Sequence, residues 1–167
     1  CLNTNDMKKA VFLDRDGVIN KKRNDYVKSV EELEIFPFSS SVVKKINDAG
    51  FLAIIITNQS AINRSLMTKN DLEKIHHYIE KHLKVNSAHI DAFYFCPHRP
   101  DENCNCRKPK PGLIKLAEKD FQIDLSSSWI IGDSISDIEA GKQVNCKTIR
   151  IGKELNLINA IEQILKH

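Results

Sequence analysis

The sequence lacks the features that would place the protein in a membrane or on a nucleic acid. Its 167 residues contain no apolar run near the roughly 20 residues that cross a bilayer, and no signal peptide is visible. The net charge of +3 is too small to indicate either partner. Internal repeats and low-complexity tracts are also missing. What remains is a chain of ordinary composition, 41% apolar and 28% charged, whose length favours one domain with a full hydrophobic core.

An initiator methionine is missing from the first position. The polar start, "CLNTND", precedes Met7 in "MKKAVFLD", which would be a plausible native start. We therefore expect residues 1–7 to be a tag or a linker, and residues 8–167 to form a single domain.

The cysteines do not suggest a disulfide framework, because the five of them are odd in number and unevenly spaced. Three lie within eleven residues beside a histidine, in the pattern C-x-H-x5-C-x-C formed by Cys96, His98, Cys104 and Cys106. Three sulfurs and one nitrogen are typical of a closed, structural zinc site, which would pin its loop. Chance clustering of surface cysteines is the alternative. Free cysteines also fit a reducing, cytoplasmic location.

Short apolar segments rich in β-formers alternate with segments of helical periodicity. Strands are expected at 10–14, 52–57, 92–95, 129–133 and 147–151, and helices at 39–50, 68–83, 110–121, 134–144 and 155–165. This alternation predicts a three-layer α/β/α fold with a doubly wound parallel sheet.

Two details of the predicted helices can be compared with the structure. The serines that begin the segment 39–50 are expected to cap it, and Gly50 to end it. In the segment 68–83, His76, His77 and His82 are expected to face solvent on the polar side.

Polar and metal-binding residues follow four of the predicted strands. Because parallel strands present their carboxyl ends at one edge of a sheet, where ligands bind in such folds, these side chains should gather at one site. They are Asp14 and Asp16, Thr57 and Asn58, Cys96, and Asp133.

Asp14 and Asp16 are of the right type for phosphoryl transfer. A carboxylate at a strand end can act as a nucleophile, and a second acid can protonate the leaving group and later activate water. Two neighbouring carboxylates repel, so Mg²⁺ with Asp133 as a further ligand would stabilise the pair. Asp137, one helical turn later, could hold the metal's water shell or orient Lys108.

The remaining phosphoryl-transfer groups would be hydrogen-bond donors and cations. Thr57, the backbone near Asn58 and Lys108 could stabilise the transferred group, and Arg107 could bind a second anionic group. Taken singly, each pattern has a simpler explanation, such as an Asp-Gly turn, a helix cap or a solvated basic run. Their joint occurrence at successive strand ends favours an active site.

Four segments, "FLDRDGVIN", "TNQS", "CRKPKPG" and "GDSISD", resemble in order the four motifs of the haloacid dehalogenase superfamily of phosphatases. The stretch "YFCPHRPDENCNCRKPKPG" is similar to the zinc loop of two of its branches, the D-glycero-D-manno-heptose-1,7-bisphosphate 7-phosphatases and the histidinol-phosphate phosphatases. The resemblance covers residues 8–152 and implies a fold without a separate cap domain. The sequence also has no room for a cap between the motifs.

The resemblance implies a role for each matching residue. Asp14 would be the nucleophile and Asp16 the general acid and base, with Thr57 and Lys108 stabilising the phosphoryl group. Mg²⁺ would be held by the carboxylates of Asp14 and Asp133 and the main-chain carbonyl of Asp16, and zinc by the cysteine-histidine set. The residues expected to bind or shape the substrate are Asn20, Asn58, Gln59, Ser60 and Arg107.

The expected substrate is the 7-phosphate of a heptose bisphosphate, in the synthesis of nucleotide-activated heptose. Histidinol phosphate or another sugar phosphate is the alternative on the same chemistry. A nucleic-acid 3′-phosphatase is a second alternative, supported by "NKKRND" but by no aromatic stacking series. A phosphorylated receiver domain is a third, and the acid at Asp16 argues against it. We expect a cytoplasmic monomer with a small-molecule partner and no nucleic acid or membrane.

Overall fold

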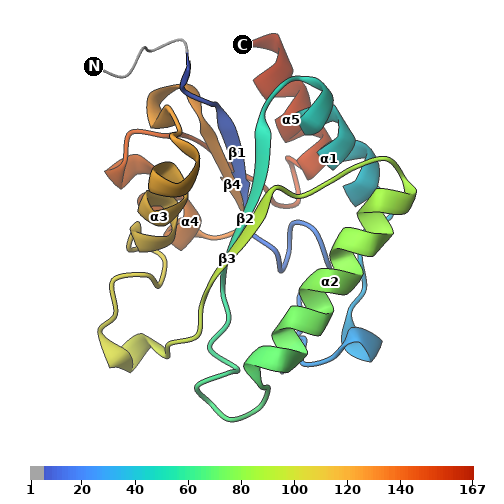
Figure 1. Cartoon of the computed structure of the whole chain (residues 1–167), viewed down its shortest axis with the longest axis vertical. Helices are drawn as coiled ribbons and strands as arrows, with labels where there is room; N and C mark the ends of the chain where they lie inside the picture. The colour runs from blue at the N-terminus through green and yellow to red at the C-terminus, as the bar shows by residue number, and fades with distance from the viewer. Residues whose placement is uncertain (1–5) are drawn as a thin grey trace.

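Residues 6–167 are described by a computed structural model of the chain, which has a five-stranded sheet between two layers of helices (Figure 1). All strand pairs are parallel, in the order β3-β2-β1-β4-β5. The strands are β1 (Ala10–Leu13), β2 (Leu52–Asn58), β3 (Ala92–Cys96), β4 (Trp129–Gly132) and β5 (Lys147–Arg150). The predicted α/β class and strand positions are confirmed. The predicted tag or linker falls mostly outside the described residues.

Helices cover both faces of the sheet, as a doubly wound fold requires (Figure 1). One layer contains α1 (Ser39–Asp48), α2 (Lys69–Val85) and α5 (Leu157–Lys166), and the other contains α3 (Gly112–Phe121) and α4 (Ile135–Gln143). Among the described residues, no helix combines the length and the apolar character that a membrane span needs.

Strand β1 lies at the centre of the sheet and contributes side chains to the two hydrophobic cores, one on each face of the sheet. Val11 and Leu13 pack in the larger core, with the α1, α2 and α5 layer, while Ala10 and Phe12 pack in the smaller core with α3 and α4. All four side chains are fully buried. Because successive side chains point to opposite faces, a strand covered on both sides must be apolar throughout, which explains the unbroken "AVFL".

The position of β1 also places the site. It pairs with β2 on one side and β4 on the other, so the chain connections diverge at its carboxyl end. This topological switch point is where open α/β sheets bind ligands, and Asp14 is the first residue beyond it.

The observed helix caps agree only in part with those predicted from the sequence. Thr68 and Asp71 form a reciprocal capping box at the start of α2. The expected serine cap of α1 is wrong, because Phe38 is its N-cap residue and makes no side-chain cap bond. Ser39 is instead buried inside the first turn, where its hydroxyl donates to the carbonyl oxygen of Ile19 at 2.6 Å. Gly50, with φ of +84°, follows the end of the helix as expected.

His76 is not on the solvent side of α2, so this expectation is wrong; His77 and His82 are exposed, as expected. Only 8% of His76 is accessible, and its ring stacks on Phe93 of β3 with centroids 4.4 Å apart. It shares the buried face with Leu72 and Ile79, four residues before and three after it.

Candidate active site

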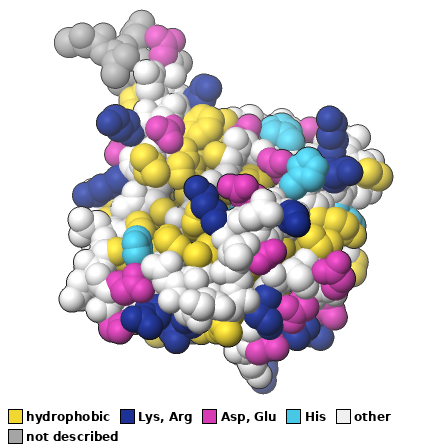
Figure 2. All heavy atoms as spheres, turned by 60° about the horizontal axis from the view of Figure 1, so that its bottom comes forward, with side chains coloured by type: hydrophobic (Ala, Val, Ile, Leu, Met, Phe, Trp, Pro, Cys, Tyr) yellow, Lys and Arg dark blue, Asp and Glu magenta, His cyan; other side chains and the backbone are white. Residues whose placement is uncertain are grey.

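A cavity of about 410 Å³ opens at the carboxyl end of the sheet. Its lining comes from the segments 14–27 after β1, 58–64 after β2, 107–108 after the cysteine loop and 133–137 after β4. In Figure 1 the chain leaves β2 and β3 toward the bottom of the view, and Figure 2 brings that side forward. On it, basic and acidic side chains are interspersed rather than gathered into one basic surface.

Asp14 is partly buried among charged groups. Its Oδ1 accepts a hydrogen bond from the backbone N–H of Arg15 at 2.8 Å and lies 3.1 Å from Nζ of Lys108. Burial raises the pKa of Asp14 to about 7; Lys108 opposes that rise, while Asp137, Asp16 and Asp133 add to it. This carboxylate is therefore costly to ionise unless a further cation is present.

Lys108 is a buried cation beside Asp14. Its ammonium donates to Oδ1 of Asp137 at 2.6 Å and to the carbonyl oxygen of Ile56 at 2.9 Å, in addition to its contact with Asp14. Burial alone would lower the pKa of Lys108, but the carboxylates of Asp14 and Asp137 raise it above its ordinary value. The side chain of Asn58 fixes the position of the lysine, since it pairs with both the N–H and the carbonyl of Lys108.

Asp16 is held by three donors. Its Oδ1 accepts from Nη2 of Arg15 and Nδ2 of Asn20, and its Oδ2 accepts from Nε2 of Gln59, each at 2.9 Å. Burial would raise the pKa of Asp16, but the charge of Arg15 and these hydrogen bonds lower it below the ordinary value. In the resting protein this group is a carboxylate with a fixed orientation.

Four of the five expected substrate-binding residues line the cavity, and the fifth does not. Asn58, Gln59, Ser60 and Arg107 line the cavity. Asn20 is fully buried and contacts Asp16 instead, so its described contact is a positioning one, and direct binding of substrate stays a prediction.

Thr57 is also fully buried at the end of β2. Its hydroxyl accepts from Nε2 of Gln59 at 2.8 Å, and the same amide group reaches Asp16. Its expected contact with a phosphoryl group stays a prediction.

A divalent cation fits the carboxylates of this site. Oxygen atoms of Asp14, Asp133 and Asp137 lie within 4.8 Å of one another. Lys108 forms ion pairs with Asp14 and Asp137, so when all three acids are ionised its single positive charge leaves two of their negative charges uncompensated. Hard carboxylate oxygens with excess negative charge suit Mg²⁺. Because Asp137 is already paired with Lys108, Asp14 and Asp133 are the better candidates for direct ligands.

Gly17 keeps Asp133 close to this cluster, which yields a prediction. A Cβ at Gly17 would lie 2.2 Å from Oδ2 of Asp133, and its φ is +87°. We expect Gly17→Ala to displace Asp133 and to weaken Mg²⁺ binding, measured by calorimetric titration, by at least about tenfold, as for other supports of metal ligands.

Gly50→Ala is the matched control. Its φ of +84° imposes the same backbone cost, about 1 kcal/mol, but the added Cβ meets no described atom within 4 Å. Equal Mg²⁺ affinities in the two variants would contradict the role assigned to Gly17.

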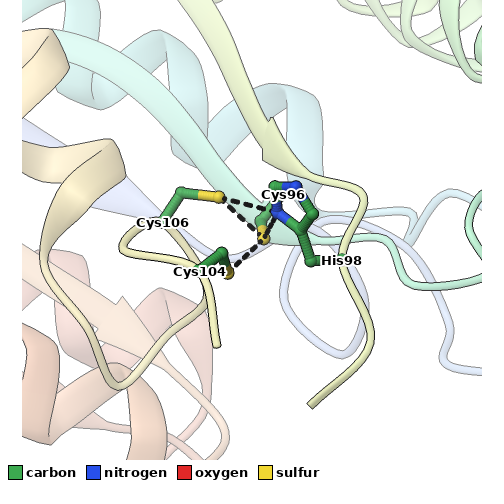
Figure 3. Close-up of side chains that lie close together, drawn as sticks. All are labelled: Cys96, His98, Cys104 and Cys106. Atoms are coloured by element: carbon green, nitrogen blue, oxygen red, sulfur yellow. Dashed lines mark hydrogen bonds between the residues drawn. The ribbon is translucent and has the colours of Figure 1, made fainter. Parts of the chain in front are cut away.

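The four predicted zinc ligands come together beside the cavity. In Figure 3 the side chains of Cys96, His98, Cys104 and Cys106 point toward one another. Nδ1 of His98 lies 3.3 Å from Sγ of both Cys96 and Cys106, and the sulfurs of Cys96 and Cys104 are 3.6 Å apart. The sulfurs of Cys96 and Cys106 are 2.9 Å apart. Ligand atoms about 2.3 Å from a tetrahedral zinc ion lie about 3.8 Å apart, so the set has the composition of such a site and would spread by less than about 1 Å to hold the ion.

The cysteine loop is joined directly to Arg107 and Lys108. The N–H of Arg107 donates to Sγ of Cys104 at 3.3 Å, and its Nη1 donates to the carbonyl oxygen of His98 at 3.2 Å. Lys108 is the next residue in the chain. The geometry of this loop therefore determines where both cations enter the cavity.

Several residues of the site were not singled out from the sequence as site residues. Arg64 lines the cavity, donates from Nε to Ser60 and lies over the ring of Tyr26, with its guanidinium carbon 5.9 Å from the ring centroid. Arg15 contacts Asp16, and its place between the two acids of "DRD" was an available signal. The helical spacing of His76 from Leu72 and Ile79 was a signal that it lies on the buried face, but nothing in the sequence indicated its contact with Arg15.

Comparisons with known proteins identify the family to which the chain belongs. A model of the HAD-hydrolase-like family matches residues 105–156. The D-glycero-beta-D-manno-heptose-1,7-bisphosphate 7-phosphatase of Helicobacter pylori is 44% identical over 87% of this chain and 83% of its own. The protein of the same name from Pseudomonas aeruginosa is 36% identical over 84% of this chain and 79% of its own.

A solved structure is similar over nearly the whole fold. It is the D,D-heptose 1,7-bisphosphate phosphatase from B. bronchiseptica complexed with magnesium and phosphate, with a TM-score of 0.88, 30% identity, and coverage of 95% of this chain and 98% of that one. On these identities and coverages, the chain belongs to the haloacid dehalogenase-like hydrolases, in the family of heptose-1,7-bisphosphate 7-phosphatases.

Proposed function

We propose that this protein is a Mg²⁺-dependent phosphatase that removes the 7-phosphate of D-glycero-D-manno-heptose 1,7-bisphosphate through an aspartyl phosphate on Asp14. One observation carries the proposal: Asp14 and Asp16 line the same cavity. Asp14 lies beside the Lys108 ammonium, and Asp16 is held in a fixed orientation by Arg15. The names of the similar proteins supply the substrate class.

In the first step a carboxylate oxygen of Asp14 attacks phosphorus, and the bond from phosphorus to the sugar oxygen breaks. Asp16 protonates that oxygen, which leaves as an alcohol. In the second step Asp16 accepts a proton from water, whose oxygen attacks phosphorus. The bond between phosphorus and the Asp14 oxygen breaks, so inorganic phosphate is released and Asp14 is again a carboxylate. One acid thus acts in both half-reactions.

The lowered pKa of Asp16 is compatible with this double role. A phosphate dianion placed in the cavity adds negative charge beside Asp16 and so raises its pKa, which favours the protonated form when substrate is bound. Departure of the leaving group and transfer of the phosphoryl group reduce that charge, which favours the carboxylate needed to accept a proton from water.

The charges around the phosphoryl group would complete the site. Mg²⁺ held by Asp14, Asp133 and the main-chain carbonyl of Asp16 would supply positive charge that lets these acids remain ionised near a phosphate. Lys108 and the Thr57 hydroxyl would donate to the transferred group. Asp137 holds Lys108 in place for that task.

The rest of the cavity suits a second phosphate. Arg107 lines it together with Lys22, Arg23 and Arg64, which come from two other segments. Planar guanidinium groups bind phosphate with paired hydrogen bonds. A substrate with phosphates at both ends would therefore meet complementary charge at both ends, and Asn58 and Ser60 would contact the sugar between them.

Initial rates with Mg²⁺ on heptose 1,7-bisphosphate and on histidinol phosphate test the substrate, with the product identified by phosphorus NMR. We expect strong preference for the bisphosphate and retention of the 1-phosphate. Preference for histidinol phosphate would reject the heptose while leaving the roles of Asp14 and Asp16 in place. Monomeric state and cytoplasmic location stay predictions from the sequence.

We also propose that the four ligands of the cysteine loop hold zinc, with a structural role. We expect Cys104→Ser to lose one bound zinc per chain, measured by elemental analysis, and to lower kcat because Arg107 and Lys108 are displaced. The control is Cys146→Ala, at a buried cysteine outside the cluster. Wild-type protein without zinc, or full activity of Cys104→Ser, would contradict this role.

A further inference from the structure

Arg15 joins the active site to the interior of the protein. Its side chain is fully buried and makes two described contacts. Nη2 donates to Oδ1 of Asp16 at 2.9 Å, and Nη1 lies 3.2 Å from Nε2 of His76. His76 in turn stacks on Phe93 at 4.4 Å between centroids. These contacts connect Phe93 of β3, through His76 of α2 and then Arg15, to the carboxylate of Asp16.

The chemistry of the two groups fixes the direction of the contact between them. Arginine has only donors, so Nε2 of His76 must be the acceptor, and the ring proton is on Nδ1. The ring must therefore be neutral. Burial, with the charge of Arg15, lowers the pKa of His76 to about 3, in agreement with this assignment.

His76 is a specific restraint on Arg15. Among the described residues, Nε of Arg15 has no hydrogen-bond partner, although it is buried. The guanidinium group is therefore oriented by two side chains, Asp16 on one side and His76 on the other. Without the acceptor on His76, Asp16 would be the one described hydrogen-bond partner of the Arg15 guanidinium, and Arg15 would orient Asp16 less firmly.

The hydrogen bonds to Asp16 select one of its two oxygens for proton transfer. Each oxygen of a carboxylate can accept about two hydrogen bonds. Among residues 6–167, Oδ1 accepts from Arg15 and Asn20, while Oδ2 accepts from Gln59 alone. Oδ2 is thus the oxygen with a free lone pair, provided that Arg15 keeps Oδ1 occupied.

We propose that His76 is a positioning residue for the phosphatase reaction: its neutral ring fixes Arg15, which occupies Oδ1 of Asp16 and directs proton transfer to Oδ2. The proposal rests on the proposed function, because it needs Asp16 to act as acid and base. His76 itself does not line the cavity.

The test uses three substitutions of one residue. His76→Phe keeps a flat ring against Phe93 and removes the acceptor. His76→Gln places a carbonyl oxygen near the former position of Nε2, whereas His76→Asn, shorter by one methylene, cannot reach Arg15. The Gln and Asn variants therefore separate the hydrogen bond from the general effect of changing a buried residue. His77→Phe, at the exposed neighbour, is the control.

Two substrates distinguish positioning from a structural role. The sugar phosphate has an alkoxide leaving group that must be protonated, while p-nitrophenyl phosphate has one that departs without a proton. The ratio kcat/KM reports on steps up to the formation of the phosphoenzyme. Only a defect in the acid should therefore affect the two substrates differently.

We expect His76→Phe and His76→Asn to lower kcat/KM for the heptose bisphosphate by about ten- to a hundredfold, part of the 10²–10⁴-fold typical of acid-base catalysis, through kcat rather than KM. For p-nitrophenyl phosphate we expect at most about a threefold change, and we expect His76→Gln to restore most of the loss. Thermal unfolding should show that all three variants fold.

An equal loss on both substrates, or full activity of both His76→Phe and His76→Asn on the sugar phosphate, would overturn the proposal. Failure of His76→Gln to do better than His76→Asn would overturn it as well. A wild-type protein inactive on the bisphosphate would instead reject the proposed substrate, and the same comparison with histidinol phosphate, also an alkyl phosphate, would still decide the role of His76.

Discussion

Asp14→Asn is expected to abolish phosphate release, by at least about 10⁴-fold in kcat, because an amide cannot form the aspartyl phosphate. Asn has nearly the same size as Asp, and it can keep the hydrogen bond that Oδ1 accepts from the N–H of Arg15. The loss would therefore reflect the missing nucleophile rather than a rearranged site. The measurement is phosphate release in the presence of Mg²⁺.

Asp48→Asn serves as the matched control for this result. Asp48 is exposed and pairs with Lys44 on the surface of α1, so its replacement should leave kcat unchanged. Activity of Asp14→Asn near the wild-type level would reject the covalent mechanism itself. A residual activity that increases with incubation would point to deamidation of the new asparagine, and mass spectrometry would detect it.

Asp14→Asn should also differ from the wild type in thermal stability. The folded protein raises the pKa of Asp14 from 3.8 to about 7, so stability present at low pH is lost as the pH rises between these values. Above pH 7, in the absence of Mg²⁺, the wild type carries the full cost of the ionised carboxylate, and Asp14→Asn does not. We expect a higher Tm for Asp14→Asn under those conditions, and a smaller difference after Mg²⁺ is added.

Lys108→Met is expected to lower kcat by about 10²–10³-fold, the usual cost of removing one charge-stabilising donor from an active site. Methionine has a similar length and can fill the same buried space. It cannot neutralise Asp14 and Asp137, nor can it donate to a phosphoryl oxygen. The expected signature is a fall in kcat with the zinc content of the cysteine loop unchanged.

Lys110→Met is the control for this substitution, because Lys110 is two residues away and exposed. In Lys108→Met the carboxylates of Asp14 and Asp137 lose the cation that pairs with both, so the metal-free variant should unfold at a lower temperature than the wild type and regain stability with Mg²⁺. Equal kcat values for Lys108→Met and the wild type would remove Lys108 from the mechanism.

Much of the fold could be predicted because its signals are local. A central parallel strand must be apolar on both faces, so "AVFL" and "LAIIIT" predict strands without any knowledge of their neighbours. The polar residues that follow such strands must lie at one edge of the sheet. Asp14 and Asp133, far apart in sequence, could therefore be predicted to share a site before any distance between them was known.

Local signals failed where a residue's partner is distant in sequence. Ser39 was expected to cap a helix, but it bonds to Ile19, and His76 was expected to face solvent, but it packs on Phe93 and contacts Arg15. The type of residue gives no indication of these partners. A serine or a histidine is satisfied equally well by water or by a buried group.

The sequence by itself determined the order of strands and helices, the chemistry of the acids at the strand ends and the composition of the cysteine-histidine set. The tertiary structure alone decided which side chains hold the charged groups of the site. Gln59 and Asn20 bond to Asp16, Asn58 bonds to Lys108, and His76 bonds to Arg15. The physical reason is that hydrogen bonds depend on positions within a few ångströms. Periodicity fixes which face a residue occupies, but the packing of α2 against β3 fixes what that face meets.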